Sequence, residues 1–165
     1  LRLDNDAKGR MESDEEVWRT ILDLTQEIGY KLKKNHLAAR GIQINVRDKN
    51  LFSCQYQMKL EYMTQSTLFL AQAAKLLFFK KHRFTTPLRS ITVRAIDLVP
   101  EDTPQQLNLF AGYDKQDDIV RLESAVDRLR ERFGNKIVVP ASLMEKTCRP
   151  TLSTDFPKMP APMYH

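Results

Sequence analysis

The sequence contains few of the residues on which catalytic and metal-binding motifs depend. Its 165 residues include five glycines, three histidines and two cysteines. The glycines form no phosphate-binding loop, and no His or Cys spacing is typical of a metal site. Cys54 and Cys148 have no partner spacing, so we expect reduced thiols and a cytoplasmic setting. The sequence therefore predicts no catalytic residue, metal or cofactor in this chain.

Long apolar segments are also missing. The longest candidate, residues 68–79, is interrupted by Gln72 and Lys75 and is shorter than the roughly 20 residues that span a bilayer. Residues 1–10 are charged and contain no apolar signal segment. Without such segments, we expect no membrane association. Because the sequence starts at Leu1 and not at Met, we also expect it to be a piece of a longer protein.

The charge is distributed in blocks. Residues 30–100 carry thirteen bases and three acids, a balance of +10, whereas residues 1–29 and 101–145 have balances of −4 and −3. A local positive field of this kind favours a polyanionic partner. A membrane surface is disfavoured, since the bases lie on predicted strands and turns and not along one amphipathic helix.

Helix signals occur in three places. Ser13 and Glu16 have the spacing of a capping box, and apolar residues follow at helical spacing to about residue 34. The acids beside Ser13 could suggest a metal site, but a capped helix start explains them. Thr64 or Ser66 caps a second helix to Lys81, which we expect to be buried on most sides. A third helix is predicted from Asp114 to Phe133, with a stripe at Ile119, Leu122, Val126, Leu129 and Phe133.

Alternating apolar and polar residues predict strands over 41–47, 52–60 and 88–95. With an N-terminal strand, either Leu1 to Asp4 or a piece preceding this sequence, the order becomes β-α-β-β-α-β. We therefore expect an α+β fold with a four-stranded antiparallel-type sheet and two helices on one face. Residues 136–140 suggest a further short strand after the third helix. The predicted division is a sheet domain (1–100), a linker (101–113), a helix and strand (114–145) and a Pro-rich tail (146–165).

Strand alternation also predicts the composition of the uncovered sheet face. Ile42, Ile44, Val46, Ile91 and Val93 should face the helices, which leaves amides, hydroxyls and cations on the other side and no acids. Such a face suits phosphates, although an ordinary solvated face is the alternative. The absence of aromatic residues disfavours a base-splaying RNA platform. With neighbouring bases included, the candidate DNA-binding residues are Arg40, Gln43, Asn45, Arg47, Lys49, Gln57, Lys59, Arg89, Ser90, Thr92 and Arg94, and Gln55 shares the face.

A second candidate site follows a Pro-bounded loop. The pentapeptide Gln106-Leu107-Asn108-Leu109-Phe110 presents apolar side chains from a segment that favours neither helix nor central strand. An exposed Leu-Phe pair is typical of a docking site, whereas packing on its own domain is the alternative. The pentapeptide resembles the bacterial sliding-clamp-binding motif Gln-Leu-x-Leu-Phe.

Together these segments resemble the little finger, the C-terminal domain of Y-family translesion DNA polymerases of polymerase IV or V type. The resemblance covers about residues 10–100 and is carried by residues 14–17, 37–47 and 87–93, followed by the clamp-like motif. It implies binding to double-stranded template–primer DNA and to a bacterial sliding clamp, in a damage-tolerant polymerase that uses Mg²⁺ in its catalytic part. The family's acidic palm residues are not in this sequence, so it should be inactive alone. Family members often carry arginines near the Tyr56 and Met58 positions, where this sequence is uncharged.

Two other functions are compatible with the sequence. An RNA-binding module of the same topology would keep the pentapeptide in its core and prefer single strands. A clamp-binding adaptor would use the helix at 115–133 for a second protein and would have no affinity for nucleic acid.

Overall fold

The computed structural model describes residues 3–82, 87–104, 114–134 and 137–144, with only the backbone path for 3–10 and 114–117. The elements follow in the order β1 (Leu3–Met11), α1 (Asp14–Lys34), β2 (Leu37–Asp48), β3 (Ser53–Thr64), α2 (Thr67–Lys81) and β4 (Leu88–Pro100). Helix α3 (Asp114–Phe133) and a short 3-10 helix, η1 (Ala141–Leu143), come after them. The predicted α+β class and its β-α-β-β-α-β order are confirmed.

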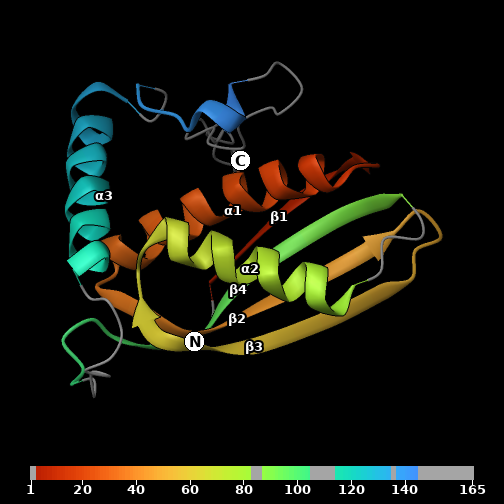
Figure 1. Cartoon of the computed structure of the whole chain (residues 1–165), viewed down its shortest axis with the longest axis horizontal. Coiled ribbons are helices and arrows are strands. Elements are labelled where there is room, and N and C mark those ends of the chain that lie inside the picture. The colour runs from red at the N-terminus through yellow and green to blue at the C-terminus, as the bar shows by residue number, and fades with distance from the viewer. Residues whose placement is uncertain (1–2, 83–86, 105–113, 135–136, 145–165) are drawn as a thin grey trace, which may run out of the picture.

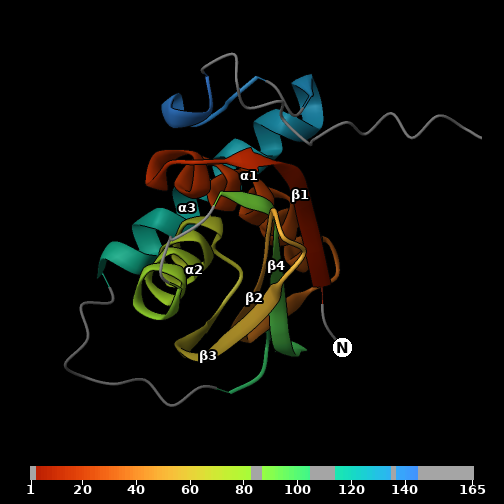
Figure 2. The same ribbon diagram turned by 90° about the vertical axis from the view of Figure 1, so that its right-hand side faces the viewer.

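The four strands form one antiparallel sheet in the order β1-β4-β2-β3. Strand β4 lies between β1 and β2, and β2 lies between β3 and β4, so α1 and α2 each connect two parallel strands with a third strand between them. Both helices cover the same face of the sheet and leave the other face uncovered (Figures 1 and 2). The N-terminal strand is present, and at Leu3–Met11 it is longer than the Leu1 to Asp4 segment we expected.

Helix α1 begins at the predicted capping box. Ser13 Oγ accepts a hydrogen bond from the backbone N–H of Glu16 (3.2 Å), and the Glu16 carboxylate accepts one from the backbone N–H of Ser13 (3.3 Å). The apolar stripe of α1 is fully buried: Val17, Ile21, Leu24, Ile28 and Leu32.

The sheet supplies the other half of the core, with the alternation that its sequence predicts. The helix-facing residues of β2 and β4 are at most 2% exposed: Ile42, Ile44, Val46, Ile91 and Val93. Each buried side chain of this size stabilises the fold by about 1.5–3 kcal/mol relative to exposure. This contribution fixes the strand register, because a shift by one residue would expose the whole apolar set.

The expectation that α2 is largely buried is confirmed for its sheet-facing side and not for its outer side. Its sheet-facing residues are buried, but Leu76 is 60% and Phe79 is 40% exposed. Helix α2 lies in the outer layer of a two-layer domain, where only the side turned toward the sheet can be covered (Figure 2). No helix in the described part of the chain combines the length and apolar composition needed to span a membrane.

Helix α3 has the predicted boundaries and lies at one end of the domain, beside the end of α1 and the start of α2 (Figure 1). Its predicted apolar stripe is largely exposed, with Leu122 at 65%, Leu129 at 44% and Phe133 at 60%. The prediction of a strand at 136–140 is wrong for the described residues 137–140. These residues form a bend and irregular chain. The backbone carbonyl of Val138 accepts hydrogen bonds from the Arg130 guanidinium (2.9 and 3.2 Å) in place of a neighbouring strand.

Candidate nucleic-acid interface

Eight of the eleven candidate DNA-binding residues lie on the uncovered sheet face. Directly opposed residues in a β-ladder point to the same side of the sheet. Gln43 is opposite both Gln57 and Arg94, and the next two rows along β2 set Asn45 opposite Thr92 and Arg47 opposite Ser90. The eight residues are Gln43, Asn45, Arg47, Gln57, Lys59, Ser90, Thr92 and Arg94. Sequence analysis did not single out Ser53, which is exposed and opposite Arg47. The alternation of β3 extended by one step would have included it.

A side-chain ladder crosses three strands of this face. The Arg94 guanidinium donates to Gln43 Oε1 (3.3 Å), and Gln43 Nε2 donates to Gln57 Oε1 (3.1 Å). Gln43 is only 7% exposed, so its amide groups are used within the sheet. Gln43 is therefore placed to orient Arg94 and Gln57, which lie on either side of it.

The other three candidates are not in the paired rows of this face. Arg40 lies at a β-bulge between Ala39 and Gly41, where β2 pairs with β3, and its side chain is exposed. Lys49 lies in the turn between β2 and β3. Arg89 is the extra residue of a β-bulge, since Ser90 pairs with Arg47 and Leu88 pairs with Asp48. Bulges redirect side chains at sheet edges.

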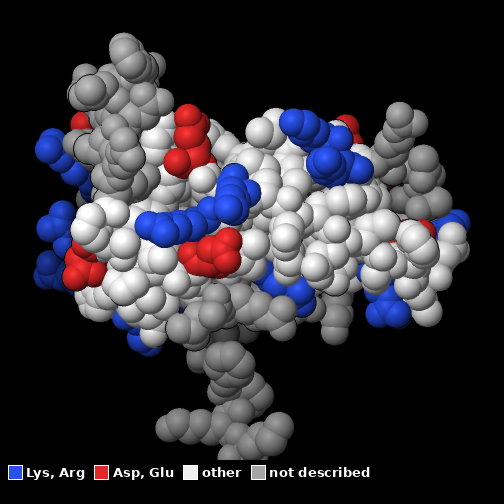
Figure 3. Space-filling model, turned by 90° about the horizontal axis from the view of Figure 1, so that it is seen from below, with Lys and Arg blue, Asp and Glu red and all other residues white. Residues whose placement is uncertain are grey.

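The fourth strand adds charged positions next to β4. In the backbone register of β1 with β4, Asp4 is opposite Arg94, Asp6 is opposite Thr92 and Lys8 is opposite Ser90. The prediction of a face without acids was made from the other three strands and stays a prediction for the complete sheet. Seen from the β3 side of the molecule, Lys and Arg side chains form separate groups, and Asp and Glu side chains lie beside several of them (Figure 3).

The end of β4 is fixed next to the predicted linker. Glu101 accepts a hydrogen bond from the Gln65 amide (2.7 Å), and its carboxylate lies 2.8 Å from His36 Nδ1. The hydrogen bond from Gln65, followed by that from His36, lowers the pKa of Glu101 below its ordinary value. The pentapeptide Gln106, Leu107, Asn108, Leu109 and Phe110 lies outside the described residues, so its placement stays a prediction.

Residues 7–109 match a protein-family model described as the impB/mucB/samB family C-terminal domain. The chain belongs to this family. The matched part is the little finger domain of Y-family polymerases, which confirms the resemblance seen in the sequence.

One curated relative agrees with this assignment, and one solved structure has a similar fold. A DNA polymerase IV of Acetivibrio thermocellus is 34% identical over 122 residues, which are 74% of this chain and 31% of that protein. The chain thus spans about a third of the length of this curated relative. The solved structure described as a complex of beta-clamp processivity factor and little finger domain of PolIV is similar with a TM-score of 0.50 and 14% identity. The match covers 67% of this chain and 100% of that chain, and it establishes a common fold.

Tyr56 and Met58, where little finger domains often carry arginines, do not lie on the uncovered face. Both pack against the core on the helix-covered side. Burial raises the pKa of Tyr56, and a hydrogen bond with Cys54 adds to the effect. Uncharged residues at these two positions therefore remove no cation from the uncovered face. The described residues include no cluster of three or more His, Cys, Asp or Glu side chains that could hold a metal ion.

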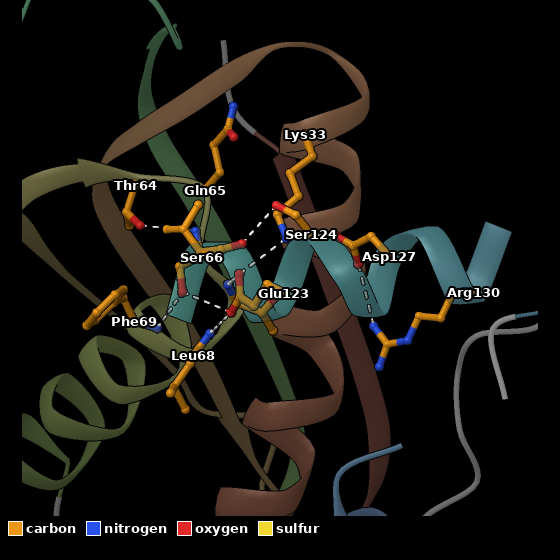
Figure 4. Close-up of polar contacts among 12 residues, drawn as sticks. Lys33, Thr64, Gln65, Ser66, Leu68, Phe69, Glu123, Ser124, Asp127 and Arg130 are labelled. Atoms are coloured by element: carbon orange, nitrogen blue, oxygen red, sulfur yellow. Dashed lines mark hydrogen bonds and ion pairs between the residues drawn. The ribbon is translucent and has the colours of Figure 1, made fainter. Parts of the chain in front are cut away.

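Helix α3 lies beyond the family match and is attached through its polar side (Figure 4). Glu123 accepts hydrogen bonds from Ser66 Oγ (2.9 Å) and from the backbone N–H groups of Thr67 (3.3 Å) and Leu68 (3.1 Å). Lys33, at the end of α1, lies 3.2 Å from Glu123 and 2.6 Å from Asp127. The Glu123 carboxylate thus binds the start of α2, where helix N–H groups have no partner within the helix. Sequence analysis missed the contact because Glu123 is far from residue 66 along the chain.

Proposed function

We propose that this little finger domain grips template–primer duplex DNA and tethers a translesion DNA polymerase to the sliding clamp. The observation that carries the proposal is the uncovered face of a domain in this polymerase family, where cations, amides and hydroxyls lie in register across three strands. Such groups bind phosphate oxygens without regard to base sequence, as a polymerase that moves along DNA requires.

The residues on the face have different proposed roles. Arg47 and Lys59 are exposed cations on neighbouring strands, so both can approach phosphates of one duplex. Arg94 contributes a third cation in an orientation that Gln43 supports. Asn45, Gln57, Ser90 and Thr92 supply uncharged donors between them. Lys49 and Arg89 extend the positive surface past the sheet, and Arg40 is an exposed cation at the bulge of β2.

The pentapeptide is the proposed tether. By its resemblance to the clamp-binding motif, Gln106 hydrogen-bonds at the rim of a clamp pocket, and Leu109 and Phe110 fill the pocket. Support comes from the solved relative, which is described as a complex with a beta-clamp. A tether raises the effective concentration of the domain at the clamp, so weak contacts to DNA suffice. In this proposal residues 1–100 bind DNA and residues 101–113 bind the clamp. The helical segment 114–145 and the Pro-rich tail 146–165 come after these two parts and have no assigned role.

The whole protein would be a DNA-directed DNA polymerase that copies damaged templates in the cytoplasm. Support comes from the curated relative's name, DNA polymerase IV. The catalytic part would use Mg²⁺, and the little finger domain alone would be inactive.

The test is duplex affinity as a function of salt. Binding of a labelled duplex should weaken steeply with salt, and Arg47→Ala/Lys59→Ala should reduce the magnitude of the log K versus log salt slope by about 2, one for each lost phosphate contact. Lys34→Ala/Lys80→Ala removes the same charge from the helix-covered side and should leave the slope near the wild-type value. Equal slopes for both pairs would contradict the proposal. Preference for single-stranded RNA would favour an RNA-binding module, and no affinity even at low salt would favour a clamp adaptor.

A further inference from the structure

The turn between β2 and β3 is held rigidly by hydrogen bonds. The backbone N–H of Asp48 donates to the Phe52 carbonyl (3.0 Å), and the backbone N–H of Phe52 donates to Asp48 Oδ1 (2.9 Å). The N–H of Leu51 donates to the Asp48 carbonyl (3.1 Å), and the N–H of Lys49 donates to the Pro87 carbonyl (3.1 Å). This turn therefore has a defined conformation and a fixed position beside the start of β4.

The rigid turn exposes two large apolar side chains. Leu51 is 50% and Phe52 is 68% exposed, and Phe52 is the most exposed aromatic residue that the structure describes. Leu51 has a φ of +68°, a left-handed conformation that is unfavourable for a bulky residue. Strained residues of this kind cluster at binding sites, where the surrounding structure maintains them.

Cations surround this apolar tip. Arg47, Lys49 and Arg89 are all exposed, from the end of β2, the turn and the bulge of β4. Asp48 is the one acid among residues 47–53, and its carboxylate accepts the Phe52 N–H. The tip adjoins the uncovered face, because Phe52 directly precedes Ser53, which forms the last row of that face with Arg47 and Ser90.

We propose that Phe52 at this turn is a stacking site for an unpaired nucleobase where the bound duplex ends. The inference rests on the proposed binding of duplex to the uncovered face. An exposed aromatic ring among cations is the composition that binds single strands, because the ring stacks on a base and the cations bind the flanking phosphates. The turn lies at the end of the sheet opposite α3 (Figure 1). A strand leaving the duplex at that end would reach Phe52 without passing α3.

The experiment compares two labelled DNAs with the same duplex, one blunt and one with a short single-stranded template extension. The wild-type chain should bind the extended DNA about tenfold more tightly, which corresponds to the stacking of one base. Phe52→Ala should abolish this preference and leave blunt-duplex affinity within twofold. Phe52→Tyr should keep the preference. Phe133→Ala removes a ring of similar exposure from α3 and should change neither affinity. A 2-aminopurine at the first unpaired position should change its fluorescence on binding to wild type and not to Phe52→Ala.

The outcomes separate this inference from the proposed function. Wild-type protein that binds both DNAs equally well, or Phe52→Ala protein that keeps the preference, would overturn the stacking site and leave duplex binding intact. Failure of the wild type to bind the blunt duplex at low salt would overturn the proposed function itself. Loss of clamp affinity in Phe52→Ala without any effect on DNA would show that the tip binds protein, and would also overturn the inference.

Discussion

Glu123 of α3 accepts a hydrogen bond from the backbone N–H of Leu68, in the first turn of α2, at 3.1 Å. A carboxylate at this position interacts favourably with the positive end of the α2 dipole as well as with the individual N–H groups. Its side chain is 16% exposed and also contacts Lys33, so one residue of α3 joins two other helices. The apolar stripe on α3 contributes little, because most of it faces solvent.

We therefore expect Glu123→Gln to loosen α3 from the domain. The variant loses the charge that pairs with Lys33 and stabilises the start of α2, which should lower the free energy of unfolding by about 1–2 kcal/mol. Hydrogen exchange should speed up most in α3 and in the first turn of α2. Glu131→Gln, on the exposed side of the same helix, is the control and should be neutral. Equal protection of α3 in both variants would show that other contacts hold the helix.

Gln43→Leu should destabilise the sheet and disturb the uncovered face together. The change removes two hydrogen bonds at a position only 7% exposed and should lower the unfolding free energy by about 1–2 kcal/mol in urea denaturation. Duplex affinity should fall as well, because Arg94 loses the group that orients it. Gln55→Leu, at an exposed position of β3 on the same face, should change stability by less than about 0.5 kcal/mol. Stability losses of the same size would argue that Gln43 has no special role.

The contact of Glu101 with Gln65 and His36 predicts a dependence of stability on pH. Because the pKa of Glu101 is lowered in the folded state, its ionised form stabilises the fold above the ordinary glutamate pKa, and this contribution is lost as the pH falls through the lowered value. Glu101→Gln should thus lower Tm at pH 7 and have a smaller effect at pH 3. The exposed Glu61→Gln should show no such difference. A Tm difference that is the same at both pH values would contradict the assignment.

Phe110→Ala should abolish clamp binding without unfolding the domain. An aromatic anchor in a pocket typically contributes more than about 2 kcal/mol, a loss of 30-fold or more in affinity. Titration of the chain with purified bacterial sliding clamp measures it, with Leu109→Ala/Phe110→Ala as the stronger variant. Asn108→Ala changes the variable position of the motif and should bind like wild type. Unchanged clamp affinity or a collapsed melting curve for Phe110→Ala would place the ring in the core.

Local sequence signals predicted the elements of this fold well. The Ser13–Glu16 capping box and the alternation around Ile44 and Ile91 each depend on residues close in the chain, and each was confirmed. The errors concern neighbours that are distant in sequence. The register that sets Asp4 and Asp6 of β1 opposite β4 depends on long-range pairing, and exposure of the α3 stripe follows from a contact with the start of α2.

The candidate site was predictable to a similar extent. Strand parity placed Arg47, Lys59 and Thr92 on one face without any knowledge of the sheet order. Parity gives no information on the bulge that displaces Arg89, or on the hydrogen bonds that withdraw Gln43 from solvent. The exposed tip at Phe52 was missed because sequence alone does not distinguish an apolar turn residue that packs inward from one held in solvent.

One contact before the linker and one contact after it are made to consecutive residues, Gln65 and Ser66. Glu101, before residues 105–113, is bonded to Gln65, and Glu123, after them, is bonded to Ser66. The chain before residue 105 and the chain after residue 113 are therefore both bonded at one corner of the domain, beside the start of α2. A clamp bound to the pentapeptide, as proposed above, would be tied to the domain at this corner from both sides.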